Sequence, residues 1–420
     1  MNRRRRRPNY FGWVVFGLVV LFGYYFNQVY LPASPLLAGP TPTETRSPEA
    51  YATEAEKFFK DGNLTGAIES YQAAINASPQ DPALYVALAR IQVWDGQYEK
   101  AQANAENALL LNNTNAMAHA VRAWALDFQD GKNGEALTEI EEALKLDDRN
   151  AVIQSYYVEI LVDSGFDNYD KAAEQSRVAL ALDSNIVETH RARGYILAVT
   201  SNYEEAIQEY DLAIAINPKL ATLQIEQGLN YRAISAKDPA IEAFTKAITL
   251  KPSDPQPYFY ISRTYATFGD YAKALQYADS ATEHDPGNTT LHANLGVMLY
   301  RNFDYIQAVT ELGLAVFGGT TEDGVKIANI PLTDDGRSSE YYFTLGLALA
   351  RTDQCGEALQ LVQELQTKVP TDDIAMDAAN KTIEICQENL NNPAVDTPTP
   401  TLPVETPTNL PDTETPVPTP

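Results

Sequence analysis

Residues Glu188–Pro218 read ETHRARGYILAVTSNYEEAIQEYDLAIAINP. The spacing of their apolar residues predicts two short amphipathic helices joined by a tight turn. Ala206 and Ala213 lie seven residues apart on one face of the second helix, Gly194 lies on the first, and Pro218 ends the pair. Small side chains at these points let two helix backbones approach closely. A single hairpin of this size cannot bury its apolar face alone, so the segment predicts a stack of such units.

The same alanine pair recurs along most of the chain. The first alanines follow one another at intervals of 34, 35, 36, 34, 34, 34 and 34 residues. The pairs are Ala67/Ala74, Ala101/Ala108, Ala136/Ala143, Ala172/Ala179, Ala206/Ala213, Ala240/Ala247, Ala274/Ala281 and Ala308/Ala315. A small residue twelve positions before the first alanine and a proline five positions after the second accompany several pairs. The regular interval predicts a repeat architecture.

The pattern resembles the tetratricopeptide repeat, and the segments QYEKAQANAENAL, NYEEAIQEYDLAIAINP and DYAKALQYADSATEHDP are close matches to it. The resemblance covers roughly residues 48–370. It implies an all-α fold, a right-handed α-solenoid of about nine helix-turn-helix hairpins over residues 48–372. The period breaks at residues 317–338, which we interpret as an insertion between hairpins, and residues 373–390 predict a single C-terminal capping helix.

The two ends of the chain differ from the repeats in composition. Residues 1–9 contain five consecutive arginines, and residues 10–31 form an apolar, aromatic segment long enough to span a bilayer. We interpret them as a cytoplasmic basic N-terminus and a transmembrane signal anchor, which places the repeats outside the cytoplasm. A cleaved signal peptide is the alternative. Residues 32–47 are a Pro/Thr/Ser-rich linker, and residues 391–420 form a Pro/Thr-rich acidic tail that we expect to be disordered.

The overall charge and the ionisable residues limit the function classes. The formal net charge is −25, which disfavours nucleic-acid binding. His119, His190 and His292 fall where sister repeats have tyrosines, so we interpret them as core residues and not as metal ligands; His284 stands alone at a hairpin end. No nucleophile–base set, phosphate loop or paired-acid signature is present, which predicts a protein that is not an enzyme and has no cofactor.

Two further features leave alternatives open. Glu322, Asp323, Asp334 and Asp335 in the insertion do not match the spacing of a calcium-binding EF-hand loop, and solvated turns account for them. Cys355 begins the second helix of the last hairpin and Cys386 lies near the end of the capping helix. Either the two cysteines form a disulfide that fixes the capping helix, in an oxidising compartment, or both are buried free thiols.

The first helix of each hairpin contributes residues to a common inner, concave surface. Aromatic and arginine side chains alternate there, a mixture suited to an extended peptide, although packing between repeats is the simpler account of many of the rings. The candidate partner-binding residues are Arg90, Trp94, Trp124, Phe128, Tyr156, Arg191, Tyr195, Arg232, Phe259, Arg263, Arg301 and Phe343. Some members of the family grip a C-terminal carboxylate through a Lys/Asn/Arg set, which this surface lacks.

The sequence therefore predicts a non-catalytic, membrane-anchored scaffold on the exterior of a bacterial cell. Its concave face binds a protein or peptide partner, and its tail contacts cell-wall or glycan material. Two other functions remain open: a secretion-associated periplasmic-type chaperone or assembly factor, and a glycan-binding accessory module in which Trp94 and Trp124 stack on sugars.

Overall fold

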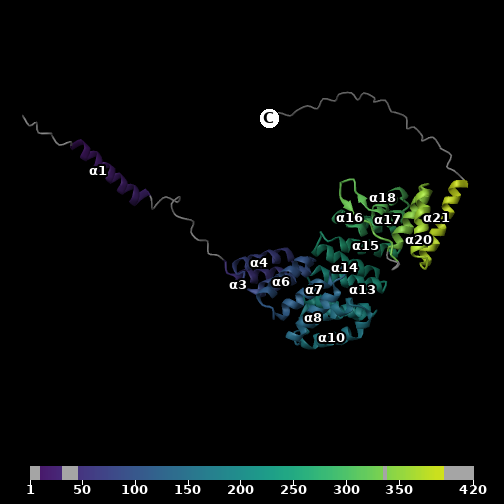
Figure 1. The fold of residues 1–420 in the computed structure, drawn as a ribbon, viewed down its shortest axis with the longest axis horizontal. Helices are drawn as coiled ribbons and strands as arrows, with labels where there is room; N and C mark the ends of the chain where they lie inside the picture. Colours follow the sequence, from purple (N-terminus) through teal and green to yellow (C-terminus); the bar gives the residue numbers. More distant parts are fainter. Residues whose placement is uncertain (1–9, 31–45, 334–337, 392–420) are drawn as a thin grey trace, which may run out of the picture. The chain divides into compact units, whose positions relative to one another are not determined.

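The computed structural model describes residues 10–30, 46–333 and 338–391. These residues fall into two compact units that divide between Ser184 and Asn185. Within the described residues, nine helical hairpins follow one another along the chain, four in the first unit and five in the second (Figure 1). The expected all-α solenoid architecture is confirmed. The predicted basic N-terminus, most of the linker and the tail from residue 392 lie outside the described residues.

The first unit contains the apolar N-terminal helix and four hairpins. The N-terminal segment is α1 (Tyr10–Tyr25), continued by the short π-helix η1 (Phe26–Tyr30). The hairpins are α3/α4 (Pro48–Lys60, Leu64–Ala77), α5/α6 (Pro82–Trp94, Tyr98–Leu111), α7/α8 (Ala116–Asp127, Asn133–Leu146) and α9/α10 (Ala151–Asp163, Tyr169–Leu182), with the 3-10 turn η2 (Phe166–Asn168) between the last two helices.

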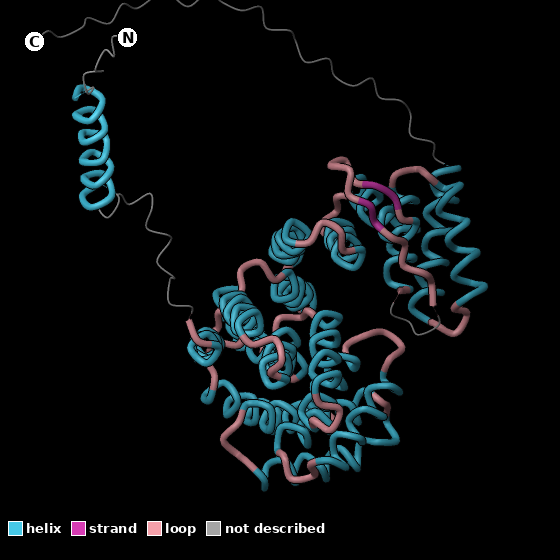
Figure 2. The backbone as a smooth tube through the Cα atoms, turned by 60° about the vertical axis from the view of Figure 1, so that its left-hand side comes forward, coloured by secondary structure: helices cyan, strands magenta, loops and turns pink. Residues whose placement is uncertain are grey.

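The second unit contains five hairpins, a small β-ribbon and the capping helix. The hairpins are α11/α12 (Val187–Val199, Tyr203–Ile216), α13/α14 (Ala221–Ala233, Lys237–Leu250), α15/α16 (Pro255–Thr267, Tyr271–His284), α17/α18 (Thr289–Arg301, Tyr305–Phe317) and α19/α20 (Ser339–Arg351, Cys355–Lys368). Strands β1 (Gly319–Thr320) and β2 (Lys326–Ile327) pair antiparallel (Figure 2), and α21 (Asp373–Asn391) ends the described chain.

Local sequence accounts for where the helices begin and turn. Asp81 and Asp254 accept hydrogen bonds from the first backbone N–H groups of α5 and α15, and each precedes a proline at the first helical position. The hairpin turns require a left-handed residue, which is glycine at several of them, for example Gly96 with φ +83°.

The repeated alanines lie at the contacts between helices. All sixteen alanines of the eight pairs have no exposed surface. In the last hairpin, Ala358 is also fully buried, and Leu365, which replaces the second alanine, is 1% exposed. The alanine positions that identify the repeat in the sequence are thus the positions where the helices pack most closely. This is expected for hairpins that are stabilised by their nearest neighbours.

Gly296 is a position where this packing leaves no room for a side chain. A Cβ atom there would lie 2.5 Å from Leu312 Cγ and 2.9 Å from the Leu312 backbone nitrogen, so α17 and α18 would have to move apart. We expect Gly296→Ala to lower the free energy of unfolding by about 2 kcal/mol, the usual scale for overpacking a core. Urea denaturation followed by circular dichroism measures this change.

Gly346 provides the matched control, because it occupies the same position in the last hairpin. A Cβ atom there would meet Thr382 Oγ1 at 3.7 Å, which is an ordinary contact. Alanine favours a helix over glycine by about 0.8–1 kcal/mol, so Gly346→Ala should leave the protein equally stable or more stable. Equal destabilisation by the two substitutions would contradict this account.

The insertion after α18 packs against the second unit. Ile327 and Leu332 are 4% and 6% exposed. The Ile330 N–H donates to the Ala315 carbonyl at 2.8 Å, and the Tyr342 hydroxyl donates to the Ile330 carbonyl at 2.8 Å. Ile327 and Leu332 therefore attach the described part of the insertion to this unit, and β1 and β2 are an element that the sequence pattern did not predict.

The capping helix α21 covers the last hairpin. Its buried residues Ala375, Ala379 and Ile385 pack into the apolar cluster formed by α17 to α20. Cys355 and Cys386 form a disulfide with Cα atoms 5.6 Å apart, which is one of the two alternatives considered from the sequence. The bond joins the start of α20 to the C-terminal part of α21.

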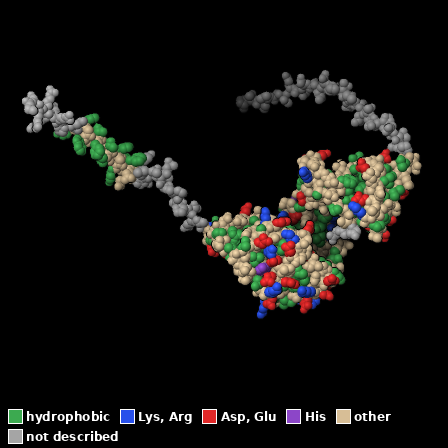
Figure 3. All heavy atoms as spheres, viewed as in Figure 1, with side chains coloured by type: hydrophobic (Ala, Val, Ile, Leu, Met, Phe, Trp, Pro, Cys, Tyr) green, Lys and Arg blue, Asp and Glu red, His purple; other side chains and the backbone are tan. Residues whose placement is uncertain are grey.

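The apolar N-terminal segment has the length and composition of a membrane span. Within the described chain, Tyr10–Val29 is the one helix that is both long enough and apolar enough to cross a membrane, and its apolar segment is not buried. Figure 3 shows apolar side chains along the visible face of α1, whereas acidic and basic side chains are interspersed over the hairpins. A signal sequence satisfies the same criteria.

Candidate protein-interaction surface

The first helices of successive hairpins contact one another in each unit: α5, α7 and α9 in the first, and α13, α15, α17 and α19 in the second. We call the surface that these helices form the first-helix face of each unit. All twelve predicted partner-binding residues belong to first helices or, for Phe128, to the residue that follows one. The first unit contains four aromatic residues and one arginine of this set, and the second contains four arginines and three aromatic residues; we call the aromatic residues of the first unit the aromatic group and the arginines of the second the arginine group.

The aromatic group occupies the first unit. The rings of Trp124 and Tyr156 stack with centroids 4.2 Å apart, and Trp94 meets Trp124 edge-on at 5.4 Å. The Trp124 indole N–H donates to Glu159 Oε2 at 2.8 Å. Trp94, Trp124 and Tyr156 are 6%, 1% and 0% exposed. These three rings pack between hairpins, so they are not accessible to a partner in this structure.

Their burial bears directly on the glycan-binding alternative, which needs exposed indole faces at Trp94 and Trp124. Neither face is exposed, so the structure provides no sugar platform at these residues. Two other predicted residues of this unit are more accessible. Phe128 is 39% exposed and stacks on Tyr98. Arg90 is half-buried, and its guanidinium lies 5.6 Å from the centre of the Phe59 ring.

The arginine group occupies the second unit, where most guanidinium groups already have carboxylate partners. Arg191 donates from Nε and Nη2 to Glu226 Oε1 at 2.9 and 2.8 Å. Burial raises the pKa of Glu226, and Arg191 opposes this rise. Arg263 Nη1 lies 3.0 Å from Glu340 Oε2, and Arg301 Nη2 lies 3.6 Å from Glu340 Oε1. These ion pairs within the chain engage arginines that the sequence pattern had predicted to bind a partner.

Arg232 is the exception in this group. It is half-buried, and it makes no hydrogen bond or ion pair with any residue that the structure describes; its guanidinium lies 5.7 Å from the centre of the Tyr260 ring. Burial lowers the pKa of Arg232, and the nearby charge of Arg263 lowers it further. A half-buried guanidinium beside a second cation favours an anionic partner.

The remaining predicted residues of the second unit are Tyr195, Phe259 and Phe343, and each is half-buried. Phe259 contacts Tyr260 edge-on, with ring centroids 5.4 Å apart, so it adjoins the ring over which Arg232 lies. Phe259, Tyr260 and Arg232 therefore form a partly exposed aromatic and cationic site on α13 and α15.

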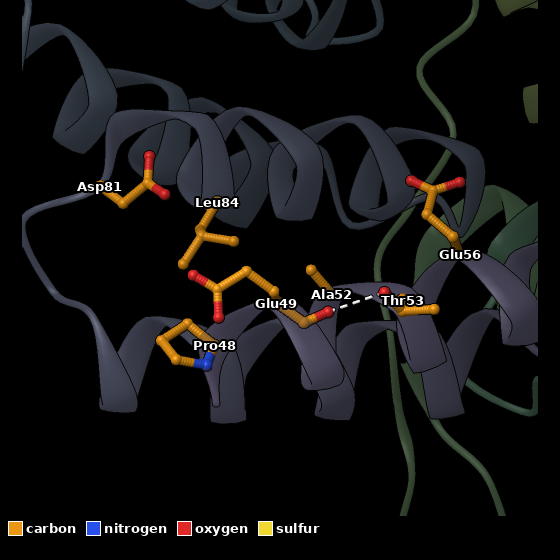
Figure 4. A pocket seen from close by; sticks show the side chains of 7 residues that line it. All are labelled: Pro48, Glu49, Ala52, Thr53, Glu56, Asp81 and Leu84. Carbon is orange, nitrogen blue, oxygen red and sulfur yellow. Dashed lines mark hydrogen bonds between the residues drawn. The ribbon is translucent and has the colours of Figure 1, made fainter. Parts of the chain in front are cut away.

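A separate hollow of about 370 Å³ lies between α3 of the first hairpin and the start of α5 (Figure 4). Its lining includes the carboxylates of Glu49, Glu56 and Asp81. Asp81 accepts from the Ala83 N–H at 2.9 Å as a helix cap, and Glu56 accepts from the Tyr71 hydroxyl. Two of the three carboxylates thus form hydrogen bonds within the first two hairpins, and the residues that line the hollow do not resemble a catalytic or metal-binding site.

Comparison with known proteins agrees with the repeat pattern. Family profiles described as "Tetratricopeptide repeat" match residues 58–125 in the first unit, and residues 161–221 and 225–289 farther along the chain. Each matched segment spans helices of successive hairpins. The chain contains tetratricopeptide repeats. Such repeats generally mediate protein–protein interaction, and proteins built from them are generally non-catalytic scaffolds.

Individual relatives are distant. The DnaJ homolog subfamily C member 7 homolog of Schizosaccharomyces pombe is 28% identical over 166 residues, which cover 35% of this chain and 35% of that protein. The chain thus spans about a third of the length of this relative. The structure of the human IFIT1 dimer with m7Gppp-AAAA has a TM-score of 0.56 at 16% identity, covering 80% of this chain and 81% of that chain. At this identity the likeness concerns the fold alone.

The histidines of the tetratricopeptide repeats have structural partners. Nδ1 of His119, His190 and His292 lies 2.8, 2.7 and 2.6 Å from a glutamate on the second helix of the same hairpin. His292 Nε2 also lies 3.0 Å from the Pro286 carbonyl, the contact that the Tyr258 hydroxyl makes with the Pro252 carbonyl in the preceding hairpin. Histidine and tyrosine thus make the same contact with a backbone carbonyl at this position of the repeat.

Within the described residues, no group of three or more His, Cys, Asp or Glu side chains is arranged to hold a metal ion. Glu322 and Asp323 of the insertion are exposed. Asp334 and Asp335, the other two acidic residues considered for calcium, lie outside the described residues.

Asp127 is a buried acid that the sequence analysis did not single out. It is 8% exposed, and burial together with the charges of Asp163 and Glu159 raises its pKa to about 9. Its Oδ1 accepts from Asn133 Nδ2 at 3.3 Å. At neutral pH Asp127 is therefore protonated, beside the acidic side chains of Asp163 and Glu159.

The raised pKa of Asp127 predicts how stability depends on pH. An unfolded aspartate has a pKa near 3.9, so between about pH 4 and pH 9 the unfolded chain releases a proton that the folded chain keeps. The contribution of Asp127 to stability is therefore lost as pH rises through this window. We expect Asp127→Asn to raise the free energy of unfolding by about 1–3 kcal/mol at pH 8.5 and by much less at pH 5.

Urea denaturation at the two pH values measures this difference. Asp130→Asn is the matched control, because Asp130 is exposed and lies in the same turn. It should change stability by less than about 0.5 kcal/mol at either pH. An equal effect of Asp127→Asn at pH 5 and pH 8.5 would show that Asp127 is not protonated in the fold.

Proposed function

We propose that the chain is a non-catalytic scaffold that binds an extended, acidic protein segment on the first-helix face of its second unit. The observation that supports this proposal is Arg232, a half-buried guanidinium without a carboxylate partner among the described residues, placed over Tyr260 beside Arg263. A carboxylate of the partner would supply the missing charge, and the rings of Phe259 and Tyr260 would supply contact area.

We propose in addition that Tyr10–Val29 anchors the protein in the membrane and that the repeats lie outside the cytoplasm of a bacterial cell. The support is the apolar composition of the helix and the run of arginines that precedes it in the sequence. Protease added to spheroplasts should digest the repeat region, and the protein should remain in the membrane fraction after alkaline washing. Release of the chain into the soluble fraction would favour a cleaved signal peptide.

A peptide selection tests the proposed binding site. A phage-displayed random peptide library is selected on the full chain in detergent, and affinities of the selected peptides are measured by fluorescence polarisation. We expect the selected peptides to contain acidic residues. Arg232→Glu should weaken their binding more than tenfold, because a charge-assisted hydrogen bond contributes about 1.5–3 kcal/mol.

Arg177→Glu is the control with the same change of charge, because Arg177 is exposed on a second helix in the first unit. It should leave peptide binding within about twofold of the wild type, since Arg177 does not belong to the proposed site and an exposed charge is largely screened by salt. Selected peptides that lack acidic groups, or that bind the Arg232→Glu variant normally, would refute the proposal.

A further inference from the structure

The turn between α17 and α18 contains a residue that does not suit its backbone. Phe303 has φ +68°, in the left-handed region where a bulky side chain is an outlier. Residues at positive φ in the corresponding turns of sister hairpins are small or polar: Gly62, Gly96, Gly131, Gly165, Ser201, Ser235, Gly269 and Asp353. The Phe303 ring is 78% exposed, so burial within the described chain does not compensate the strain.

Phe303 lines a hollow of about 640 Å³ between two successive hairpin turns of the second unit. One wall is the start of α18, with Tyr305 and with Ile306, which is 76% exposed. The other wall is the turn from α19 to α20, which begins at Arg351. The hollow thus has an apolar wall that faces solvent and a basic residue opposite it.

Aromatic rings give this hollow its shape. Phe303 and Tyr305 meet edge-on with centroids 6.4 Å apart, and Tyr300 lies 5.4 Å from Tyr305. Burial raises the pKa of the Tyr300 hydroxyl, and the nearby charge of Arg351 opposes this rise. Asp304 is the one acid of the lining, and its carboxylate accepts from the Gln307 N–H at 3.2 Å as the cap of α18. The arginine charge is therefore available to an acidic segment.

The described chain ends beside this hollow. The disulfide between Cys355 and Cys386 holds the C-terminal part of α21 against the start of α20. Asn389 Nδ2 donates to the Ala350 carbonyl at 2.9 Å, and Ala350 immediately precedes Arg351. The chain that follows Asn391 therefore starts next to the hollow, and seven extended residues reach about 20 Å.

The sequence that follows has the composition of a ligand for such a surface. Residues 392–420 contain Asp396, Glu405, Asp412 and Glu414 and no lysine, arginine or histidine. They include the segment PTPTLPVETP at residues 398–407, in which Pro400 and Pro403 enclose two residues. Proline-rich segments of this type adopt a polyproline II helix and bind aromatic-lined grooves.

We propose that residues 398–407 bind in the hollow formed by Phe303, Tyr305, Ile306 and Arg351 of the same chain. The prolines and Leu402 pack on the exposed rings, and Glu405 pairs with Arg351. This surface lies at the hairpin turns, and the proposal is independent of the partner-binding site at Arg232.

A labelled peptide that comprises residues 396–408 tests this proposal by fluorescence polarisation. It should bind the chain that lacks residues 392–420. It should bind the full chain at least tenfold more weakly, because there the tethered segment, at an effective concentration of about 1 mM, competes for the same hollow. Phe303→Gly should weaken binding to the shortened chain at least tenfold. This variant relieves the strain of the turn, so its thermal stability should equal or exceed that of the parent. A peptide with alanines in place of its prolines should not bind.

A cross-linking measurement identifies the occupant directly. The photoreactive residue p-benzoyl-phenylalanine, placed at Ile306 in the full chain, should cross-link to residues 396–408 of the same molecule with a yield independent of protein concentration. Cross-links between molecules, or dimers in sedimentation that Phe303→Gly abolishes, would overturn the proposal in favour of a second copy. Equal peptide binding by the full and shortened chains, or no binding by either, would also overturn it.

Discussion

Replacing Trp124 with alanine is expected to lower the free energy of unfolding of the first unit by about 4 kcal/mol. The indole is 1% exposed, stacks on Tyr156 and meets Trp94 edge-on, and its N–H donates to Glu159. Removing a buried tryptophan costs about 3–5 kcal/mol through lost contacts and the cavity that remains. Glu159, itself 2% exposed, also loses the indole donor.

Trp124→Phe separates the two contributions, because phenylalanine retains an aromatic ring but has no N–H. We expect it to cost less than Trp124→Ala. Phe128→Ala is the control for a neighbouring aromatic residue, since this ring is 39% exposed. Hydrogen exchange of α7 and α9 measures the local loss, because repeats are stabilised mainly by their nearest neighbours. An effect of Trp124→Ala no larger than that of Phe128→Ala would contradict the importance of the aromatic stack.

The fold was predictable because its determinants are local and periodic. A fully buried alanine such as Ala206 is both the mark that recurs every 34 to 36 residues and the point of closest helix contact. The hairpin length and the turns follow from the same pattern, and the apolar spacing of residues 373–390 predicted the capping helix. The β-ribbon at Gly319–Ile327 was not predicted, because two-residue strands have no sequence period of their own.

The candidate site was predictable only as a surface and not residue by residue. Trp124 and Arg232 occupy first helices in the same way, yet the first is fully packed and the second is partly exposed. The difference depends on side chains from other helices, such as Glu159 and Tyr156 for Trp124, which periodicity does not reveal. Pairing of Arg263 with Glu340 joins residues 77 positions apart, across the insertion.

One missed feature did have a signal in the sequence. Asp127 and Asp163 are 36 residues apart, the same interval that separates Ala136 from Ala172 in those two repeats. Acids at equivalent positions of adjacent first helices are expected to face each other, as Asp127 and Asp163 do. Comparison of equivalent positions between repeats would therefore have predicted a close acid pair, although not which of the two is buried.

Loss of the disulfide between Cys355 and Cys386 should also lower the stability strongly. The bond closes a loop with a sequence separation of 31, for which the chain-entropy relation gives about 3–4 kcal/mol. It connects the last hairpin to α21, whose apolar residues complete the core of the second unit at its C-terminal end. A terminal repeat without its capping element exposes an apolar face to water.

We therefore expect Cys355→Ser/Cys386→Ser to lower the stability of α19, α20 and α21 by about 3 kcal/mol, with little effect on the first unit. Hydrogen exchange resolves this difference by segment. Dithiothreitol should reproduce the effect in the wild type and should leave the double variant unchanged, which separates loss of the bond from the change of side chains. Equal protection of α21 in the oxidised wild type, the reduced wild type and the double variant would show that packing alone holds the capping helix in place.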